Sequence, residues 1–286
     1  MSERAGATVA AELPADLERR FGGLRRLYGD AGYLRLRQAR VAVVGLGGVG
    51  SWAVEALARS GVARLVLIDL DQVAESNINR QVQALSSTLG QAKTEALRRR
   101  ILDIHPGCEV VAVEDFVQPD NWPALLPCEV DVLIDACDQV RAKATLAAWG
   151  AAVGVPVVCV GAAGGKSRAE EVEVADLAEV THDPLLASLR QRLRQAARQV
   201  VGADQARASN AVMGLCCVFS RERVAGAAAL GASGSQAQAE AGAPLACHGY
   251  GSSVAVTATF GMVAAGQAIT QLLSLASPRR APKIDL

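Results

Sequence analysis

Short apolar runs alternate with amphipathic runs along most of this chain. The apolar runs predict strands at residues 40–45, 64–69, 108–114, 130–136 and 155–161. Helical patterns lie between them, at residues 51–60, 91–104 and 140–154. Continuous Val/Ile/Leu strands that alternate with helices are typical of a sheet covered on both faces. The pattern therefore predicts an α/β fold with a doubly wound, largely parallel sheet.

The pattern changes after residue 161. Residues 170–180 alternate like a partly exposed strand, and residues 216–220 resemble a short strand. Leucines and arginines recur at helical spacing in residues 184–200, which predicts a helix with a basic stripe. We therefore expect extra C-terminal strands and helices beside the main sheet.

The first predicted strand runs directly into a glycine-rich turn. Residues 45–50 read GLGGVG, and the helical pattern SWAVEALARS follows. Such a turn can hold phosphates on backbone N–H groups, although GxGxxG alone also occurs in ordinary tight turns. Asp69 ends the second strand, where a carboxylate can accept hydrogen bonds from a ribose. Together these features predict a nucleotide site at the carboxyl ends of the strands of a Rossmann-like sheet, where Asp138 also falls.

A polar stretch separates this chain from a plain dinucleotide-binding fold. Residues 76–80 read SNINR, and a dinucleotide fold has no need for an arginine at this place. Arg80 and Lys93 suit a triphosphate, although each alone has the alternative of being a solvated surface charge. Asp138 has two interpretations, a helix N-cap or a metal ligand, and it could serve as both.

The composition limits the partners of this 286-residue chain. The formal net charge is zero, so a nucleic-acid surface must be a local basic patch. The seven cysteines contain no CxxC pair and are odd in number, which argues against a zinc ribbon and a disulfide framework. We expect Cys137, Cys216, Cys217 and Cys247 to be packing residues and His105, at a helix end, to be structural.

The two ends of the chain bear on localisation. The N-terminus has no apolar run, so a secretory signal is not expected and the cytoplasm is predicted. Residues 249–278 carry no charge and include an apolar stretch long enough to span a bilayer. Its apolar residues are mostly small and are interrupted by Thr and Gln. We therefore expect a buried helix or an oligomer interface, and no membrane span.

Four features together resemble the ubiquitin-activating-like superfamily, which includes the adenylyltransferases of molybdopterin and thiamine biosynthesis. They are GLGGVGS, LIDLDQVAESNINRQ, Lys93 and DACDQVRAK. Within it, RFGGLRRLYG, VEVADLAEVTHDPLLASLRQRLR and YGSSVAVTATFG are similar to the tRNA threonylcarbamoyladenosine dehydratases. The resemblance covers roughly residues 19–275. It implies ATP and Mg²⁺ as cofactors, tRNA as substrate, a homodimer, and a cysteine-desulfurase or sulfur-acceptor system as a candidate partner.

The resemblance also implies a set of site residues. The nucleotide-binding residues are Gly45, Gly47, Gly48, Gly50, Asp69, Asp71, Asn77, Arg80, Lys93, Asp138 and Gln139. The glycines would line the phosphates, Asp69 would bind the ribose, and Asn77 with Arg80 would contact the triphosphate. Arg80, Lys93 and Asp138 would be catalytic, with Asp138 as the Mg²⁺ ligand. Attack of a carboxylate on a phosphate brings two anions together, so cations must offset their repulsion.

Other parts of the resemblance concern RNA and the partner subunit. Arg190, Arg194 and Arg198 would bind tRNA, the alternative being an ordinary solvated helix face. In the adenylyltransferases an arginine near the N-terminus completes the neighbouring site, for which Arg25 and Arg26 are the candidates here. This chain departs from those enzymes in two ways, because it lacks their zinc-binding CxxC pairs and has Gln139 where they often have Asn.

These observations divide the chain and leave three functions open. We expect a disordered lead (1–18), one domain (19–275) with a nucleotide-binding half (39–160) and a substrate and dimer half (161–275), a mobile loop (225–244) and a tail (276–286). Residues 16–38 predict one or two short helices. The favoured function is ATP-dependent dehydration, that is cyclisation, of threonylcarbamoyladenosine next to the tRNA anticodon. The alternatives are adenylation of a ubiquitin-like sulfur carrier and an NAD-binding or scaffold module.

Overall fold

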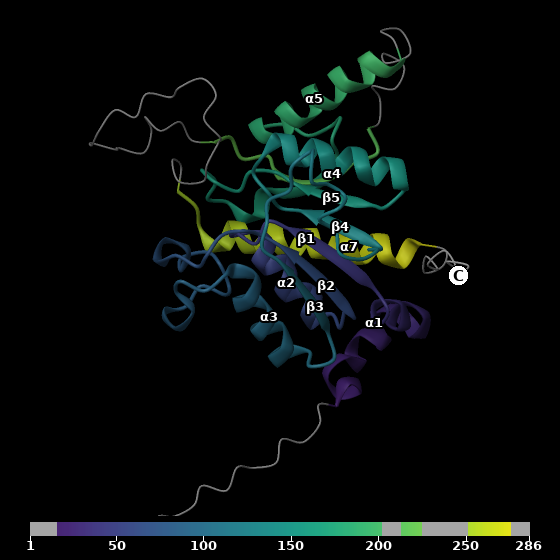
Figure 1. Cartoon of the computed structure of the whole chain (residues 1–286), viewed down its shortest axis with the longest axis vertical. Helices are drawn as coiled ribbons and strands as arrows, with labels where there is room; N and C mark the ends of the chain where they lie inside the picture. The colour runs from purple at the N-terminus through teal and green to yellow at the C-terminus, as the bar shows by residue number, and fades with distance from the viewer. Residues whose placement is uncertain (1–15, 202–212, 225–250, 276–286) are drawn as a thin grey trace, which may run out of the picture.

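A single sheet with helices on both faces forms the core of the protein (Figure 1). The computed structural model describes residues 16–201, 213–224 and 251–275. In chain order the strands are β1 (Arg40–Val44), β2 (Arg64–Ile68), β3 (Glu109–Val113), β4 (Val132–Asp135), β5 (Val157–Val160), β6 (Val172–Asp176) and β7 (Cys216–Ser220). Their order in the sheet is β3-β2-β1-β4-β5-β7-β6. All neighbours are parallel except β6 and β7, which are antiparallel. The prediction of a largely parallel α/β fold with extra C-terminal strands is confirmed.

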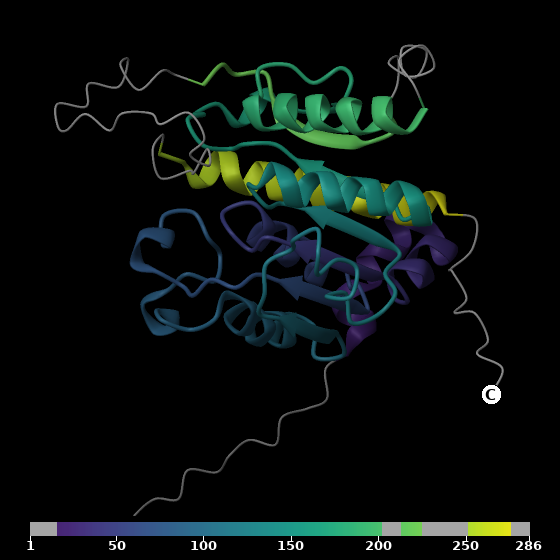
Figure 2. The same cartoon turned by 45° about the horizontal axis from the view of Figure 1, so that its top comes forward.

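The helices cover the sheet according to the alternation of its side chains. They are α1 (Leu17–Leu36), α2 (Gly50–Arg59), α3 (Lys93–Ile104), α4 (Val140–Val153), α5 (Pro184–Val201) and α7 (Val254–Ser274). Val41 and Val43 of β1 belong to the core cluster shared with α2, α3 and α7, whereas Ala42 and Val44 belong to the cluster shared with α4 and α5. Figure 2 shows α5 beside α4 on the second face. Both faces of the sheet are therefore buried, as continuous apolar strands require.

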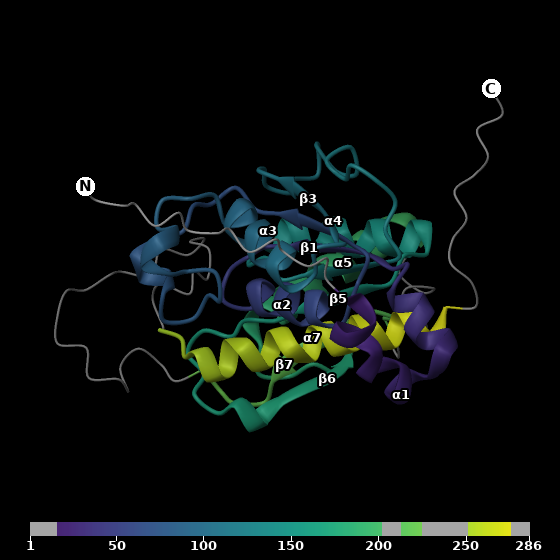
Figure 3. The same cartoon turned by 90° about the horizontal axis from the view of Figure 1, so that it is seen from below.

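The uncharged segment near the C-terminus forms α7, which lies along α2 and contacts α1 (Figure 3). By length and composition α7 could cross a membrane, but half of its most apolar stretch is buried in the protein. Gly261 explains the close packing, because a Cβ there would lie 2.5 Å from the Val49 carbonyl oxygen and 2.7 Å from Trp52 Cβ. The prediction of a helix packed within the protein is confirmed for this inner face.

The N-terminal region forms one helix interrupted at Gly29, whose φ of 72° is non-helical. This agrees with the prediction of one or two short helices. The helix begins at Leu17, so the predicted lead of residues 1–18 ended two residues too late. The rest of that lead, the predicted loop at 225–244, the tail at 276–286 and Cys247 lie outside the described residues.

His105 follows α3 and is completely buried. Its Nε2 accepts a hydrogen bond of 2.7 Å from Arg37 Nη1, and its ring lies 4.8 Å from that of Phe21. Burial, together with the charges of Arg37 and Arg20, lowers the pKa of His105 from 6.5 to about 4. The predicted structural role of this histidine is confirmed.

Candidate functional site

A pocket of about 490 Å³ opens at the carboxyl ends of β1, β2 and β4. Nucleotide and cofactor pockets fall in this size range, and ligands of such sheets bind at this edge. All of the predicted nucleotide-binding residues line it except Gly50. The structure therefore brings together residues from the glycine turn, the ends of β2 and β4, the SNINR stretch and the start of α3.

The glycines of the turn are needed for different reasons. Gly45 has a φ of 85°, and a Cβ there would meet the Ala136 backbone at 2.9 Å. A Cβ on Gly50 would lie 1.8 Å from the Gly45 carbonyl oxygen, so these two glycines allow the turn to close. A Cβ on Gly47 would meet nothing within 4 Å, yet Gly47 lines the pocket. Gly47 therefore leaves room for a ligand beside the N-terminus of α2.

Asp69 holds the glycine turn in place. Its Oδ2 accepts a hydrogen bond of 2.6 Å from the Leu46 N–H, and its Oδ1 accepts one of 2.8 Å from the Asp71 N–H. Burial raises the pKa of Asp69, while the nearby Lys93 charge opposes this rise. The sequence indicated a ribose ligand, which stays a prediction, but gave no sign of this bond to the turn.

Lys93, the first residue of α3, is a buried cation at the wall of the pocket. Its Nζ lies 2.6 Å from Asp71 Oδ2 and 3.7 Å from Asp69 Oδ1. Only 5 % of the residue is exposed, so the alternative of a solvated surface charge is wrong for Lys93. A buried ammonium at this place can offset the negative charge of a bound phosphate.

Asn77 and Arg80 shape the polar loop on another side of the pocket. Asn77 is buried, and its Oδ1 accepts a hydrogen bond of 3.0 Å from the Ala74 N–H. Arg80 Nη1 donates to the Ser76 carbonyl at 2.7 Å and to Asn79 Oδ1 at 2.9 Å. The Arg80 side chain also covers Gly48, since a Cβ there would lie 3.2 Å from Arg80 Cγ. The contact of either residue with a triphosphate stays a prediction.

Asp138 and Gln139 follow β4 and are exposed at the pocket. The N-cap of α4 is Gln139, and it makes no side-chain capping bond, so capping does not explain Asp138. The described residues contain no cluster of three or more His, Cys, Asp or Glu side chains that could hold a metal ion. Mg²⁺ commonly takes one or two carboxylates and completes its shell with water and phosphate oxygens. A single exposed carboxylate at this pocket is compatible with that ion.

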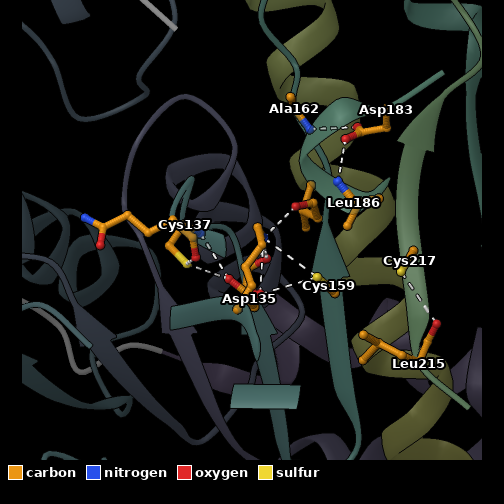
Figure 4. A network of polar contacts seen from close by, with 11 residues as sticks. Asp135, Cys137, Cys159, Ala162, Asp183, Leu186, Leu215 and Cys217 are labelled. Atoms are coloured by element: carbon orange, nitrogen blue, oxygen red, sulfur yellow. Dashed lines mark hydrogen bonds and ion pairs between the residues drawn. The ribbon is translucent and has the colours of Figure 1, made fainter. Parts of the chain in front are cut away.

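A buried network that the sequence did not indicate surrounds Asp135, the last residue of β4 (Figure 4). Lys143 Nζ lies 3.1 Å from Asp135 Oδ2, and both side chains are almost completely inaccessible. The thiols of Cys137 and Cys159 donate to the same carboxylate, at 2.9 and 3.3 Å. Burial, and then the Asp135 charge, raises the pKa of the Cys137 thiol well above its usual value. Cys137 is therefore a neutral packing residue, as predicted. The one available signal was a lysine on the apolar face of a predicted helix.

The predicted basic stripe of α5 is not uniformly exposed. Arg190 Nη1 donates to the carbonyls of Leu177 at 3.0 Å and Val180 at 2.8 Å, which ties α5 to the segment after β6. Arg194 is half-buried and Arg198 is exposed. Their contact with tRNA stays a prediction. Of the N-terminal candidates, Arg25 forms ion pairs with Glu18 and Asp30, whereas Arg26 is exposed.

The comparisons with known proteins agree with this geometry. A model of the ThiF family matches residues 22–284. The tRNA threonylcarbamoyladenosine dehydratase of Escherichia coli (strain K12) is 41 % identical over 260 residues, which are 90 % of this chain and 95 % of the relative. The dehydratase of Haemophilus influenzae is 38 % identical over 269 residues, which are 94 % and 98 % of the two chains.

A solved structure and a more distant relative complete the comparison. The E. coli dehydratase in complex with ATP matches with a TM-score of 0.77 at 38 % identity, over 92 % of this chain and 98 % of that chain. The E. coli molybdopterin-synthase adenylyltransferase is 37 % identical, but only over 123 residues, which are 43 % of this chain and 49 % of the relative.

Proposed function

This chain belongs to the ThiF family, and we propose that it catalyses the ATP-dependent dehydration of threonylcarbamoyladenosine next to the anticodon of tRNA. The observation that carries the proposal is the extent of the likeness. Similarity to the dehydratases of E. coli and H. influenzae runs over 90 % or more of the chain, whereas similarity to the E. coli molybdopterin-synthase adenylyltransferase covers 43 % of it. The second half of the chain, which would meet the RNA, is therefore shared with the enzymes that act on tRNA.

The reaction begins with activation of the carboxylate of the modified nucleoside. A carboxylate oxygen attacks the α-phosphorus of ATP, and pyrophosphate leaves. The carbamoyl nitrogen then attacks the acyl carbon and loses its proton, the acyl C–O bond breaks, and AMP leaves. The ring closes with the formal loss of one water, because the carboxyl oxygen departs on AMP.

The pocket residues stabilise the charge that accumulates in the first step. The N–H groups of the glycine turn bind phosphate oxygens at the start of α2. Lys93 and Arg80 offset the repulsion between the entering carboxylate and the phosphate, while Asp69 and Asp71 accept hydrogen bonds from the ribose and its neighbourhood. Asp138, with Gln139 beside it, would hold Mg²⁺, which supplies Lewis-acid stabilisation of the phosphate oxygens.

We further propose a cytoplasmic homodimer joined through the outer face of α7. This face exposes uncharged residues at helical spacing, namely Ala255, Met262, Gly266 and Thr270. An uncharged helix face of this kind suits a second copy of the chain. Sedimentation equilibrium of the parent and of a Gly266→Glu variant tests the interface, and a dimer that persists unchanged in the variant would exclude it.

Nucleoside mass spectrometry tests the function. tRNA that carries threonylcarbamoyladenosine is incubated with the protein, ATP and Mg²⁺, and the nucleosides are then analysed. We expect the modified nucleoside to lose the mass of one water only when ATP is present, and chromatography of the nucleotides to show AMP with pyrophosphate. Release of ADP would refute the adenylate route. An unchanged nucleoside, with adenylation of a sulfur-carrier protein instead, would refute the proposed substrate.

A further inference from the structure

Lys143 lies on α4 and is completely buried. Its Nζ donates to the Val160 carbonyl at 2.7 Å and pairs with Asp135 Oδ2 at 3.1 Å. Burial by itself disfavours the ammonium, but the negative charge of the Asp135 carboxylate raises the pKa of Lys143 above its ordinary value. Lys143 therefore forms a buried ion pair with Asp135 in the interior of the protein.

This ammonium joins the carboxyl ends of two adjacent strands. Asp135 is the last residue of β4, and Val160 is the last residue of β5. The next residues after β5, Gly161 and Ala162, line the nucleotide pocket. Asp183 holds Ala162 from the other side, since its Oδ2 accepts a hydrogen bond of 2.9 Å from the Ala162 N–H (Figure 4). The carboxyl end of β4 and the segment that follows β5 are thus fixed by buried charged groups.

The Asp135 carboxylate extends this restraint to the segment that carries Asp138. Its Oδ1 accepts hydrogen bonds from the Cys137 N–H at 3.2 Å and from the Cys137 thiol at 2.9 Å. The same segment packs on the glycine turn, because a Cβ on Gly45 would lie 2.9 Å from the Ala136 carbonyl carbon. A shift of Asp135 would therefore move Asp138 relative to the phosphate site.

We propose that Lys143 is a positioning residue, which acts through Asp135 and the backbone at Cys137 to hold Asp138 where it can bind Mg²⁺ beside the ATP phosphates. The proposal rests on the function proposed above for Asp138. A buried ion pair is weak evidence for stability, because apolar residues of similar volume often stabilise a protein more. A pair at this position is better explained by the geometry that it enforces on the pocket.

Calorimetric titration of ATP, without tRNA, tests this role. The quantity measured is the Kd of ATP in EDTA divided by its Kd in saturating Mg²⁺, which we call the Mg²⁺ factor. In Lys143→Met this factor should fall by about tenfold or more, as is usual when residues that orient a metal ligand are removed. ATP affinity in EDTA should stay within about threefold of the parent, because the glycine turn and Asp69 are retained. An unchanged Mg²⁺ factor in folded Lys143→Met overturns the proposal.

Two further variants separate positioning from stability. Arg40→Met serves as the control, because it breaks another ion pair, the partly buried one between Arg40 and Asp131 (2.8 Å), at the opposite end of the strands. This variant should lower the Tm while leaving the Mg²⁺ factor unchanged. Lys143→Met removes the partner of a buried carboxylate and is expected to lower the Tm as well. If it does not fold, the Asp135→Asn/Lys143→Met variant has no unpaired buried charge and carries the same test.

The outcomes also distinguish this proposal from the proposed function. A parent protein that binds ATP with a clear Mg²⁺ factor but leaves tRNA unmodified would refute the dehydratase function and leave the role of Lys143 standing. A normal Mg²⁺ factor in folded Lys143→Met, with an active parent, would refute the positioning role alone. A Mg²⁺ factor that falls equally in Arg40→Met would show a general effect of destabilisation and would also overturn the proposal.

Discussion

Gly47→Ala should weaken ATP binding without destabilising the fold. No atom lies within 4 Å of the added Cβ, and Gly47 does not need a left-handed φ, so the fold can accept the methyl group. Replacing a loop glycine at a compatible position stabilises proteins by about 0.4–1 kcal/mol through the unfolded chain. The Tm should therefore stay the same or rise. The methyl group would instead occupy the space in which a phosphate approaches the backbone of the turn.

The loss of ATP affinity can be worked out from the bonds that would be displaced. Hydrogen bonds from N–H groups to a charged phosphate contribute about 1.5–3 kcal/mol each. Losing one such bond should weaken ATP binding about tenfold to a hundredfold, since about 1.4 kcal/mol corresponds to tenfold in Kd. Isothermal titration calorimetry at saturating Mg²⁺ measures this change directly, and scanning calorimetry gives the Tm of the same samples.

Two control variants make the test specific. Gly50→Ala places a Cβ 1.8 Å from the Gly45 carbonyl oxygen, so it should destabilise the protein by about 1–3 kcal/mol even without ATP. Gly22→Ala in α1 also meets nothing within 4 Å but is remote from the pocket, so it should leave ATP affinity unchanged. If Gly47→Ala bound ATP within about threefold of the parent, the phosphates would not lie on the glycine turn, and our placement of ATP would be wrong.

The remaining predictions concern the metal ligand, a cysteine, acid stability and RNA. Asp138→Ala should lower turnover by about a hundredfold or more in saturating Mg²⁺, measured as AMP release, and near-normal turnover would exclude the metal role. Cys216→Ala, whose half-buried thiol has a pKa raised by burial to about 11, should keep most of its activity because activation by ATP needs no thioester, and an inactive but folded variant would indicate sulfur transfer. Because the pKa of His105 is lowered in the folded protein, the unfolded chain takes up a proton first as the pH falls. The free energy of unfolding should therefore decrease by up to about 3 kcal/mol between pH 6.5 and pH 4. Urea unfolding of His105→Gln at several pH values should lack this part of the decrease. Replacing Arg194 and Arg198 with Ala should reduce the log–log salt slope of tRNA binding by about two units in filter binding, while Arg190→Ala should chiefly lower the Tm; an unchanged slope would make the helix an ordinary solvated face.

Hydrophobic periodicity was sufficient to predict the sheet and the edge at which the pocket opens. Strands such as residues 41–44 are buried on both faces, so each one shows in the sequence as a run of consecutive apolar residues. The motif positions were also predictable, because parallel strands that begin at one edge must end together at the other. The direction of β6 was not predictable, since the alternation in residues 172–176 reports exposure and says nothing about which way the neighbouring strand runs.

The parts of the site that were missed depend on contacts between distant residues. Lys143 stands among apolar residues of α4, and only the fold shows that its ammonium meets Asp135 and the Val160 carbonyl. Arg190 has the helical spacing of an exposed stripe, but its guanidinium is bound to two carbonyls of the preceding segment. Periodicity places a residue on a face of its own helix, whereas its partners are set by tertiary packing.

The position of α7 has a consequence for how the protein is made. The nucleotide turn and α2 come early in the chain, yet α2 packs most extensively against α7, and Ser252 and Thr257 contribute to the wall of the pocket. Domains generally fold as their chain leaves the ribosome, the N-terminal parts first. This pocket cannot be finished in that order, because translation must pass residue 274 before α2 is covered. A nonsense mutation before residue 254 would therefore leave the glycine turn intact and still remove Thr257 from the pocket wall and the helix that covers α2.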